Sequence, residues 1–421
     1  MSSLRVLIVG ASIAGPTAAY WFAKAGAEVT IIERFPHLRP GGQNVDIRSV
    51  GVTVMRRMQG MEAAVRANLV PIEGISFVRD DGRPYGTIRS TGNPDEQALV
   101  SEFEILRGDL ARILVDMTKD NPNIRYIFGE QVASMSYNDH RDGPVHIEFA
   151  NGLQPADFDL VVACDGANSR TRAIGFECGV RDHVQPTNCF AAYTSAQKDF
   201  FDGDKVGHAF TAPGGKFLAI GPDPTGISRM TFMGIDRSSD NPTILSFREA
   251  QARGDEALKT FVAEHFREVG WKTEEAIQHM LKAEDFYASE LVQVKPPSLH
   301  RGRIVLAGDA GYAPGPTGTG TSLALGGAYI LAGEVNAHKD DLAAGLKAYQ
   351  ERMGPIIDDL QRLNPMALSV IAPQTKLGIW LRNAIFSVIC WLGVLDFIQK
   401  YFGSAFESGE KHRLKDYTFE H

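Results

Sequence analysis

Glycines and a carboxylate near the N-terminus have the types and the spacing that suit nucleotide binding. The run Gly10-Ala-Ser-Ile-Ala-Gly15 links an apolar strand to a helical pattern, and Glu33 follows about 20 residues later. Glycines let the backbone approach a pyrophosphate, helix N–H groups favour the anion, and the carboxylate can accept from ribose hydroxyls. Ser12 replaces the middle glycine of this pattern, but serine is small and its hydroxyl can donate. The pattern predicts a dinucleotide site without separating NAD from FAD; a tight turn without a ligand is the alternative.

A second segment combines an acid, a glycine and arginines after a buried strand. Asp165 and Gly166 end the apolar run from 158 to 164, and Ser169 and Arg172 follow in the next turn. Glycine permits the turn, and an arginine can meet a phosphate or hold Asp165. A plain turn with a local salt bridge explains the same residues equally well.

A third segment places a carboxylate and a glycine-rich loop before a long apolar helix. Gly308 and Asp309 follow a buried strand, and the loop leads into a helical pattern over 322–336; its notable residues are Pro316, Gly318, Thr319 and Gly320. Bare backbone at a helix N-terminus suits a flat ligand that carries negative charge, as a reduced flavin does around N1 and the C2 carbonyl. The alternative is a phosphate-type loop for another ligand.

The elements around these segments predict an α/β fold. Apolar strands over 4–9 and 28–32 flank a helix over 13–25, which is a βαβ unit of a parallel sheet, and strands of the same kind return at 158–164 and 303–307. A hairpin is expected over 76–89, and a helix over 102–119. From 180 to 292 apolar and polar residues alternate, which favours a mostly antiparallel sheet in an inserted domain.

Composition excludes several classes of protein. The chain has 421 residues, a net charge of −8 and four cysteines without metal-type spacing. The acidic balance argues against nucleic-acid binding, and free cysteines without a secretory signal favour a reducing, cytoplasmic compartment. No metal site is expected. The uncharged stretch 384–395 is too short to span a bilayer; it predicts a docked C-terminal helix, with peripheral membrane contact as the alternative.

Together the three segments resemble the class A flavoprotein monooxygenases, the para-hydroxybenzoate hydroxylase-like family, over most of the chain. Within that family the chain is most similar to tetracycline-inactivating monooxygenases and hydroxylases of polycyclic natural products. The resemblance implies that Glu33 binds the adenosine ribose, Asp309 the ribitol chain and Asp46 the FAD, and that Arg39 is associated with NADPH. It implies further FAD contacts from the three motifs and two flanking segments: Gly10, Ser12, Ile13, Ala14, Gly15, Arg34, Arg107, Val132, Asp165, Gly166, Gly308, Pro316, Gly318, Thr319 and Gly320.

The resemblance also implies a domain organisation. A Rossmann-type FAD-binding domain would carry an inserted, mostly antiparallel α+β substrate domain and a C-terminal helix. The expected parts are the FAD-binding domain over 1–75, 96–179 and 293–354, the substrate domain over 76–95 and 180–292, and a C-terminal helical segment over 355–421.

The implied activity is oxygen insertion. The enzyme would use NADPH or NADH and O₂, through a flavin C4a-hydroperoxide, to hydroxylate an aromatic or polycyclic small molecule of natural-product or xenobiotic metabolism. The alternative is an FAD-dependent reductase or dehydrogenase that inserts no oxygen. No W-x-W-x-I-P segment is present, which disfavours halogenation, and no second G-x-G-x-x-G unit is present, which disfavours the two-dinucleotide reductases. Oligomeric state stays open between monomer and dimer.

Candidate catalytic residues are few. Tyr193 and His208 lie on the inserted sheet and could help a phenolic substrate to lose its proton, and Arg48 could face the flavin or the nicotinamide. For each a structural role is the alternative. Apolar side chains of the inserted domain predict a flat, largely apolar substrate; they are Phe190, Phe210, Phe217, Met230, Phe232 and Met233.

Overall fold

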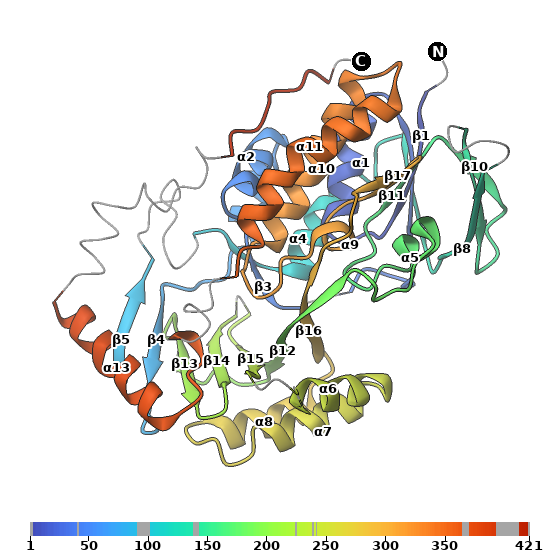
Figure 1. Ribbon diagram of the computed structural model, residues 1–421. Helices are drawn as coiled ribbons and strands as arrows, with labels where there is room; N and C mark the ends of the chain where they lie inside the picture. The colour runs from blue at the N-terminus through green and yellow to red at the C-terminus, as the bar shows by residue number, and fades with distance from the viewer. Residues whose placement is uncertain are drawn as a thin grey trace.

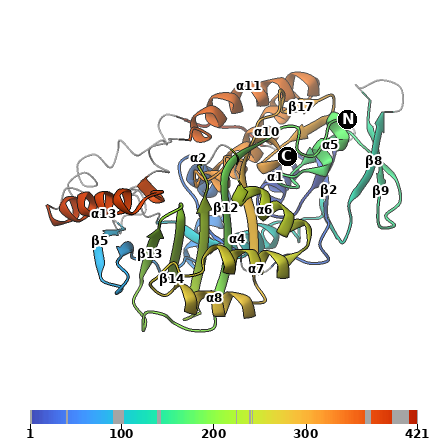
Figure 2. The ribbon, with the colours of Figure 1, turned by 60° about the horizontal axis from the view of Figure 1, so that its bottom comes forward.

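The computed structural model describes residues 3–39, 42–90, 102–137, 143–223, 225–237, 240, 242–363, 370–392 and 412–419. Two large sheets dominate it, and most of the helices cover their outer faces (Figures 1 and 2). The N-terminal sheet and its helices form the upper part of Figure 1, and the second sheet lies below them. This mixed α/β architecture agrees with the fold class predicted from the sequence.

The first sheet has six strands in the order β17-β18-β11-β1-β2-β7. Neighbouring strands are parallel except β17 and β18, which are antiparallel. In sheet order the strands are β17 (His300–Arg301), β18 (Ile304–Leu306), β11 (Leu160–Ala163), β1 (Arg5–Val9), β2 (Glu28–Glu33) and β7 (Ile124–Phe128). All four residues of β11 are buried, as expected for a parallel strand that is covered on both faces.

Helices cover one face of this sheet and a small antiparallel sheet covers the other. The helices that belong to this half of the molecule are α1 (Ala14–Lys24), α2 (Val50–Arg57), α3 (Met61–Arg66), α4 (Arg107–Asp116), α5 (Arg170–Phe176), α9 (Asp309–Tyr312), α10 (Gly320–Ala337) and α11 (Leu342–Leu360). The small sheet has the strands β8 (Val132–Tyr137), β9 (Val145–Phe149) and β10 (Ala156–Phe158). Leu7 and Ile32 of the parallel sheet share a buried cluster with Val132 and Ile147 of the small sheet.

The second large sheet has seven strands in the order β16-β12-β15-β14-β13-β4-β5. Its strands are β4 (Gly74–Val78), β5 (Pro84–Arg89), β12 (Val184–Ala196), β13 (Val206–Ala212), β14 (Lys216–Pro222), β15 (Ser228–Ile235) and β16 (Tyr287–Val294). Only the β13–β4 pair is parallel, so the prediction of a mostly antiparallel sheet and of a 76–89 hairpin is confirmed. The helices α6 (Pro242–Ala252), α7 (Asp255–His265) and α8 (Thr273–Lys282) cover one face (Figure 2).

A two-stranded ribbon joins β3 (Asn44–Asp46) to β6 (Glu104–Leu106). The sequence predicts a continuous helix over 102–119, but α4 begins only at Arg107 because residues 104–106 pair with β3. The apolar periodicity that predicts the helix begins only at Leu106, so it gives no support for helix in the residues before it. Ile105 is fully buried in the core, which fixes the ribbon against the helices.

The C-terminal part returns to both halves of the molecule. Helix α13 (Lys376–Trp391) lies along β5 at the edge of the second sheet (Figure 1), which confirms a docked helix in the C-terminal segment. Residues 393–395 of the predicted apolar stretch lie outside the described residues. Residues 412–419 dock on the first half, where the Tyr417 hydroxyl donates to the buried Glu334 carboxylate at 2.6 Å. In the described part of the chain, no helix is long and apolar enough to cross a membrane.

Candidate active site

The N-terminal glycines are required by close backbone contacts. A Cβ on Gly10, whose φ is +113°, would lie 2.5 Å from the carbonyl oxygen of Cys164, and a Cβ on Gly15 would overlap the carbonyl oxygen of Gly10. Ile13 and Ala14 are buried at the start of α1, whereas Ser12 is only partly buried. The turn therefore leaves bare backbone and the first N–H groups of α1 at one edge of the sheet, which suits an anion.

Glu33 at the end of β2 holds this turn in place. One carboxylate oxygen accepts from the Ala11 N–H at 2.9 Å, and the other accepts from the Phe35 N–H at 3.1 Å. Both oxygens keep further lone pairs that ribose hydroxyls could use. Arg34 is exposed and stacks on the Phe35 ring at 4.8 Å, so its charge is accessible beside Glu33.

The second motif stabilises its own turn. The Asp165 carboxylate accepts from the Ser169 hydroxyl and from both the N–H and the hydroxyl of Thr171, at 3.0 and 2.9 Å. Gly166, with φ of +87°, has open space around it and can present backbone to a ligand. The Asp165 side chain is thus committed to the start of α5, and the ligand-facing part of this motif is its backbone.

Arg172 has a structural role that differs from both alternatives raised by the sequence. It is fully buried, and its guanidinium donates to the carbonyl oxygens of Ala310 at 2.7 Å, Ala167 at 2.9 Å and Val180 at 2.7 Å. It therefore holds neither a phosphate nor Asp165. Its bonds fasten the second motif to α9 of the third motif.

The third motif meets the first. Gly308 has φ of +63°, and a Cβ there would come within 2.8 Å of the Ala14 Cβ. The next residue, Asp309, borders open space with its side chain exposed, yet the surrounding protein raises the pKa of its carboxyl, against the opposing charge of Arg107. The three motifs are thus brought to one place, as the sequence predicts for walls of a single pocket.

The glycine-rich loop ends at the N-terminus of α10. Gly318 has φ of +75° with no protein atom within 4 Å of a Cβ, and Pro316 is partly exposed. The Thr319 hydroxyl donates to the Leu360 carbonyl at 3.1 Å, which anchors the loop to the end of α11. Gly320 begins the helix, so its N-terminal N–H groups are the free donors at this side of the site.

The β3–β6 ribbon brings three further predicted residues to the same region. Arg48 contacts the Asp46 carboxylate at 3.3 Å, and its N–H donates to the Ser322 hydroxyl of α10 at 2.9 Å. The N–H of Arg107 donates to the Gln43 carbonyl at 3.0 Å, at the junction of ribbon and α4. Arg48, Asp46 and Arg107 therefore border the loop that enters α10.

Val132 lies differently from these residues. Its side chain is buried among Leu7, Val9 and Ile32 between the parallel sheet and the small sheet. Any contact of Val132 with a nucleotide would therefore involve its backbone.

Arg39 links the first half to the second sheet. Its guanidinium lies 5.1 Å from the Phe35 ring centre and 4.9 Å from that of Tyr287 on β16. Both distances are within cation–π range. The next two residues, Pro40 and Gly41, lie outside the described residues.

Strand alternation decides which residues of the second sheet face this region. Phe190 of β12 and Phe232 of β15 pack with the helices α6–α8. Tyr193 is an odd number of positions from Phe190 on its strand, so it lies on the opposite face. There it stacks with its cross-strand partner Tyr287, with ring centres 6.4 Å apart at 15°. Burial raises the pKa of Tyr193 well above its usual range, so its phenol stays protonated and is able to donate a hydrogen bond.

His208 lies on the other face. It shares that face of β13 with Phe210, and its ring centre is 4.3 Å from Phe201 and 6.3 Å from Trp271, beside the start of α8. Desolvation lowers the pKa of its imidazole. The structure therefore does not bring His208 together with Tyr193, and His208 is not retained as a candidate base.

Most apolar residues expected to line the substrate space pack elsewhere. Phe190, Met230 and Phe232 belong to the cluster under α6–α8, and Phe210 belongs to a cluster with Val78. Phe217 and Met233 are cross-strand partners on the Tyr193 face. Only these two of the six expected residues can therefore line a space between the two sheets.

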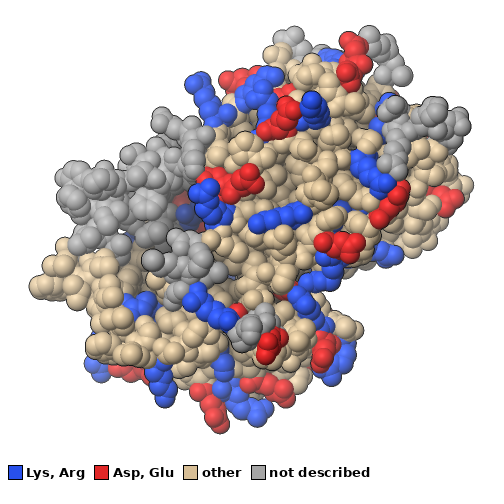
Figure 3. Space-filling view, in the orientation of Figure 1, with Lys and Arg blue, Asp and Glu red and all other residues tan. Residues whose placement is uncertain are grey.

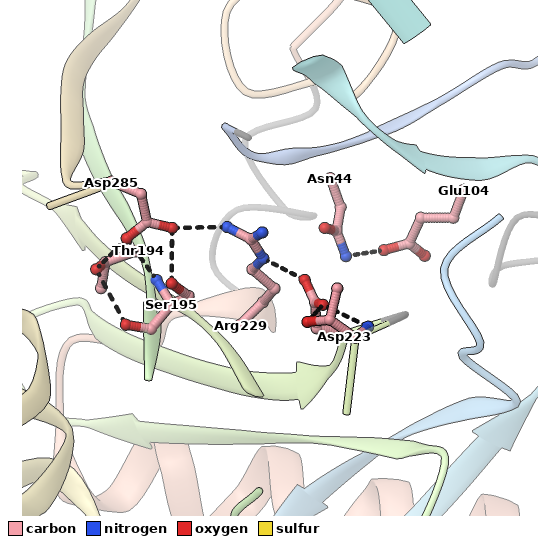
Figure 4. A network of polar contacts seen from close by, with 8 residues as sticks. Asn44, Glu104, Thr194, Ser195, Asp223, Arg229 and Asp285 are labelled. Atoms are coloured by element: carbon pink, nitrogen blue, oxygen red, sulfur yellow. Dashed lines mark hydrogen bonds and ion pairs between the residues drawn. The ribbon is translucent and has the colours of Figure 1, made fainter. Parts of the chain in front are cut away.

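A charged network on the Tyr193 face was missed at the sequence level (Figure 4). Arg229 of β15 bridges Asp223 at 2.6 Å and Asp285 at 2.8 Å, and Asp285 also accepts from the Ser195 hydroxyl at 2.8 Å. A lone arginine in an otherwise apolar strand was the available signal. In the same view, Asn44 and Glu104 of the ribbon lie on the other side, with a 2.7 Å bond between them.

Comparisons with known proteins agree with this site. Residues 3–362 match the family model described as FAD binding domain. The chain belongs to this FAD-binding family. Monooxygenase CTB7 of Cercospora beticola is 32% identical over 403 residues, which cover 93% of this chain and 94% of that protein. The FAD-dependent monooxygenase asL4 of Sarocladium schorii is 33% identical over 417 residues, with the same coverage.

Solved structures give the same result. Tetracycline destructase Tet(51) superimposes with a TM-score of 0.75 at 26% identity, covering 93% of this chain and 98% of that one. HpxO of Klebsiella pneumoniae, complexed with FAD and uric acid, has a TM-score of 0.69 at 17% identity and covers 94% of this chain and 96% of its own, which supports the fold. The predicted relationship to class A flavoprotein hydroxylases is confirmed, and the enzyme is an FAD-dependent monooxygenase.

Proposed function

We propose that this monooxygenase inserts one oxygen atom into an aromatic or polycyclic small molecule, bound between the FAD site and the Tyr193 face of the second sheet. The observation that carries the proposal is the convergence of Gly10, Gly308 and the Asp46 ribbon beside a sheet face that presents the Tyr193–Tyr287 stack. That face is carried by strands β12, β14, β15 and β16, which lie within the segment 180–292 that we propose as the main part of the substrate domain.

The residues fit FAD. The glycine turn of α1 would hold the pyrophosphate, Glu33 the adenosine ribose, and Asp309 the ribitol chain. Free N–H groups near Gly318 and Gly320 would stabilise negative charge on the flavin ring. When bound, FAD accepts a hydride from NADPH or NADH and activates O₂. The protein holds the ring, excludes water and orients the substrate.

Arg39 and Arg48 are proposed to have different roles. Arg39 is exposed and has aromatic partners on both halves of the molecule, so a nicotinamide nucleotide phosphate could displace these stacking contacts. Arg48 is fixed between Asp46 and α10 and would hold its charge close to the ring. Arg39→Ala should therefore raise the KM for NADPH more than it changes FAD binding.

Tyr193 is proposed as a substrate contact. Its raised pKa keeps the hydroxyl protonated, so it can donate to a keto or phenolate oxygen but cannot serve as a base at neutral pH. Phe217 and Met233 on the same face would contact a flat ring system. The similarity to two tetracycline destructases of known structure, at 26% and 29% identity, favours a polycyclic substrate.

The test couples spectroscopy to product analysis. Purified protein should have flavin absorption bands that bleach on anaerobic addition of NADPH. A panel of phenols, anthraquinones and tetracyclines should then contain compounds that stimulate NADPH oxidation and gain one oxygen. Stimulated oxidation with a product of unchanged oxygen content would instead support the reductase alternative.

We also propose that the outward face of α13 contacts a membrane surface. Leu377, Trp380 and Trp391 are 72%, 65% and 83% exposed. On the inward face Phe386 packs against Phe77 of β4, Arg382 donates to the Thr211 hydroxyl and Ser387 donates to the Tyr85 carbonyl. These contacts fix which side of α13 faces outward. The surface over α13 is largely uncharged in Figure 3.

Because the protein has a net charge of −8, binding should need no anionic lipid. Flotation with phosphatidylcholine vesicles should recover the wild type, and Leu377→Glu with Trp380→Glu should abolish recovery without changing NADPH oxidation. If the vesicles recover no more of the wild type than of the double variant, the proposal is wrong. The four free thiols support a cytoplasmic location, which we propose on that ground.

A further inference from the structure

The β3–β6 ribbon has one apolar face and one charged face. Asp46 and Glu104 are direct cross-strand partners, so their side chains leave the ribbon on the same side, with Cβ atoms about 5 Å apart. Ile105, between Glu104 and Leu106, points the other way into the core. Two carboxylates are thereby held together on the face that borders the proposed FAD site.

The cations around the pair do not balance two negative charges. Arg48 contacts Asp46 at 3.3 Å. Arg107, at the start of α4, interacts with Asp309, and Arg229 of β15 is bound to Asp223 and Asp285. Asp46 therefore has a cationic partner in direct contact, whereas Glu104 forms no ion pair with a cation among the described residues.

Glu104 has a neutral partner instead. The Asn44 side-chain amide donates to one carboxyl oxygen of Glu104 at 2.7 Å. Burial and then the charge of Asp46 raise the pKa of Glu104 to about 7, while Asn44 and Arg48 act in the opposite direction. Burial also raises the pKa of Asp46, against Arg48. Two acids this close lose their protons in two separate steps.

We propose that Asp46 and Glu104 hold a single proton between them near neutral pH, and that Glu104 is thereby a positioning residue that sets the charge beside the flavin. This inference rests on the proposed FAD site. With one proton the pair carries one negative charge, which Arg48 offsets. Loss of that proton adds an uncompensated negative charge next to the ring, which disfavours reduced flavin because reduced flavin is itself anionic.

The first test needs neither flavin nor substrate. Infrared difference spectra of the apoprotein, with ¹³C-labelled glutamate, should contain a protonated-carboxyl band that disappears as the pH is raised through about 7. Glu104→Gln should lack this band, and Glu264→Gln, an exposed residue of α7, should keep it. If the wild type has no such band at about pH 6, where a group of this pKa is mostly protonated, the proposal is wrong.

The second test measures how the charge of the pair affects the binding of FAD in its two redox states. The affinity for reduced FAD relative to oxidised FAD should fall by on the order of tenfold between about pH 6 and about pH 8, beyond the flavin's own titration. Glu104→Gln should remove this extra fall, and Glu104→Asp should retain part of it if Gln does not fold. An equal fall in wild type and Glu104→Gln would overturn the proposal, whereas absence of FAD binding by the wild type would overturn the FAD site itself.

Discussion

Gly308 lies directly against Ala14: a Cβ on Gly308 would approach the Ala14 Cβ to 2.8 Å. The contact joins the first and the last of the three motifs, and it explains why residue 308 has no side chain. Gly308→Ala should therefore push the Asp309 loop away from α1. We expect a loss of about 1–3 kcal/mol in stability and at least about tenfold weaker FAD binding, measured by thermal unfolding and by fluorescence titration of apoprotein.

Gly226→Ala is the matched control for this substitution. Gly226 also has positive φ, at +82°, but no atom lies within 4 Å of its Cβ position. It should share the backbone strain and leave FAD binding unchanged. Equal effects of both substitutions on FAD affinity would show that strain, and not the contact with Ala14, is responsible.

Glu33 anchors the glycine turn through the Ala11 N–H and the Phe35 N–H, and it is proposed to bind ribose as well. Glu33→Ala should weaken FAD binding by about 10- to 100-fold, because bonds to a charged acceptor are lost. Glu28→Ala, at the other end of β2, removes an exposed carboxylate that contacts Ser3 and should bind FAD normally. Unchanged affinity in Glu33→Ala would remove Glu33 from the site.

Substitutions of Tyr193 and His208 should affect turnover differently, because the two residues lie on opposite faces of the sheet. With a substrate that stimulates NADPH oxidation, Tyr193→Phe should lower kcat/KM by about tenfold through loss of one hydrogen bond. Its pH profile should keep the wild-type shape, since the Tyr193 hydroxyl stays protonated. His208→Ala should leave kcat/KM within about twofold. A large effect of His208→Ala on turnover, in a folded variant, would contradict the assignment of faces.

The lowered pKa of His265 predicts that the stability of the second half of the molecule falls in acid. Burial lowers the pKa of His265 from 6.5 to about 4, so the unfolded chain binds its proton more readily than the folded chain. Stability should therefore fall as the pH drops below about 6.5 and level off below about 4, by a few kcal/mol at most. Urea unfolding across this range measures the loss. His265→Phe should reduce the slope.

The sequence predicted best where a residue has a local steric or chemical reason. Gly10, Gly15 and Gly308 could be recognised because no other residue fits their turns, and Glu33 because it ends a strand at a fixed spacing. Tyr193 and His208 could not be separated by the same means. Which face each residue takes depends on strand register, and β12 contains an irregularity between Pro186 and Cys189.

Glu104 and Arg229 were missed for a related reason. The Glu104–Asp46 pair exists only because residues 104–106 pair with 44–46, whereas the helix expected over 102–119 would place Glu104 in a helix. Arg229 gains its role from Asp223 and Asp285, which belong to different strands and loops. Partners of this kind are fixed by tertiary pairing, which one sequence without its structure does not reveal.

Arg172 has a consequence for how the enzyme is made. Two of its three bonds are local, to the carbonyl groups of residues 167 and 180, whereas the third reaches residue 310, which follows the whole seven-stranded sheet in the chain. During vectorial synthesis the ribosome must therefore complete the second half of the molecule before the first half can close around its cofactor. Until residues 304–310 are made, the Arg172 guanidinium lacks its Ala310 partner and β11 lacks its neighbour β18. We therefore expect flavin to be incorporated only late in the biogenesis of the enzyme.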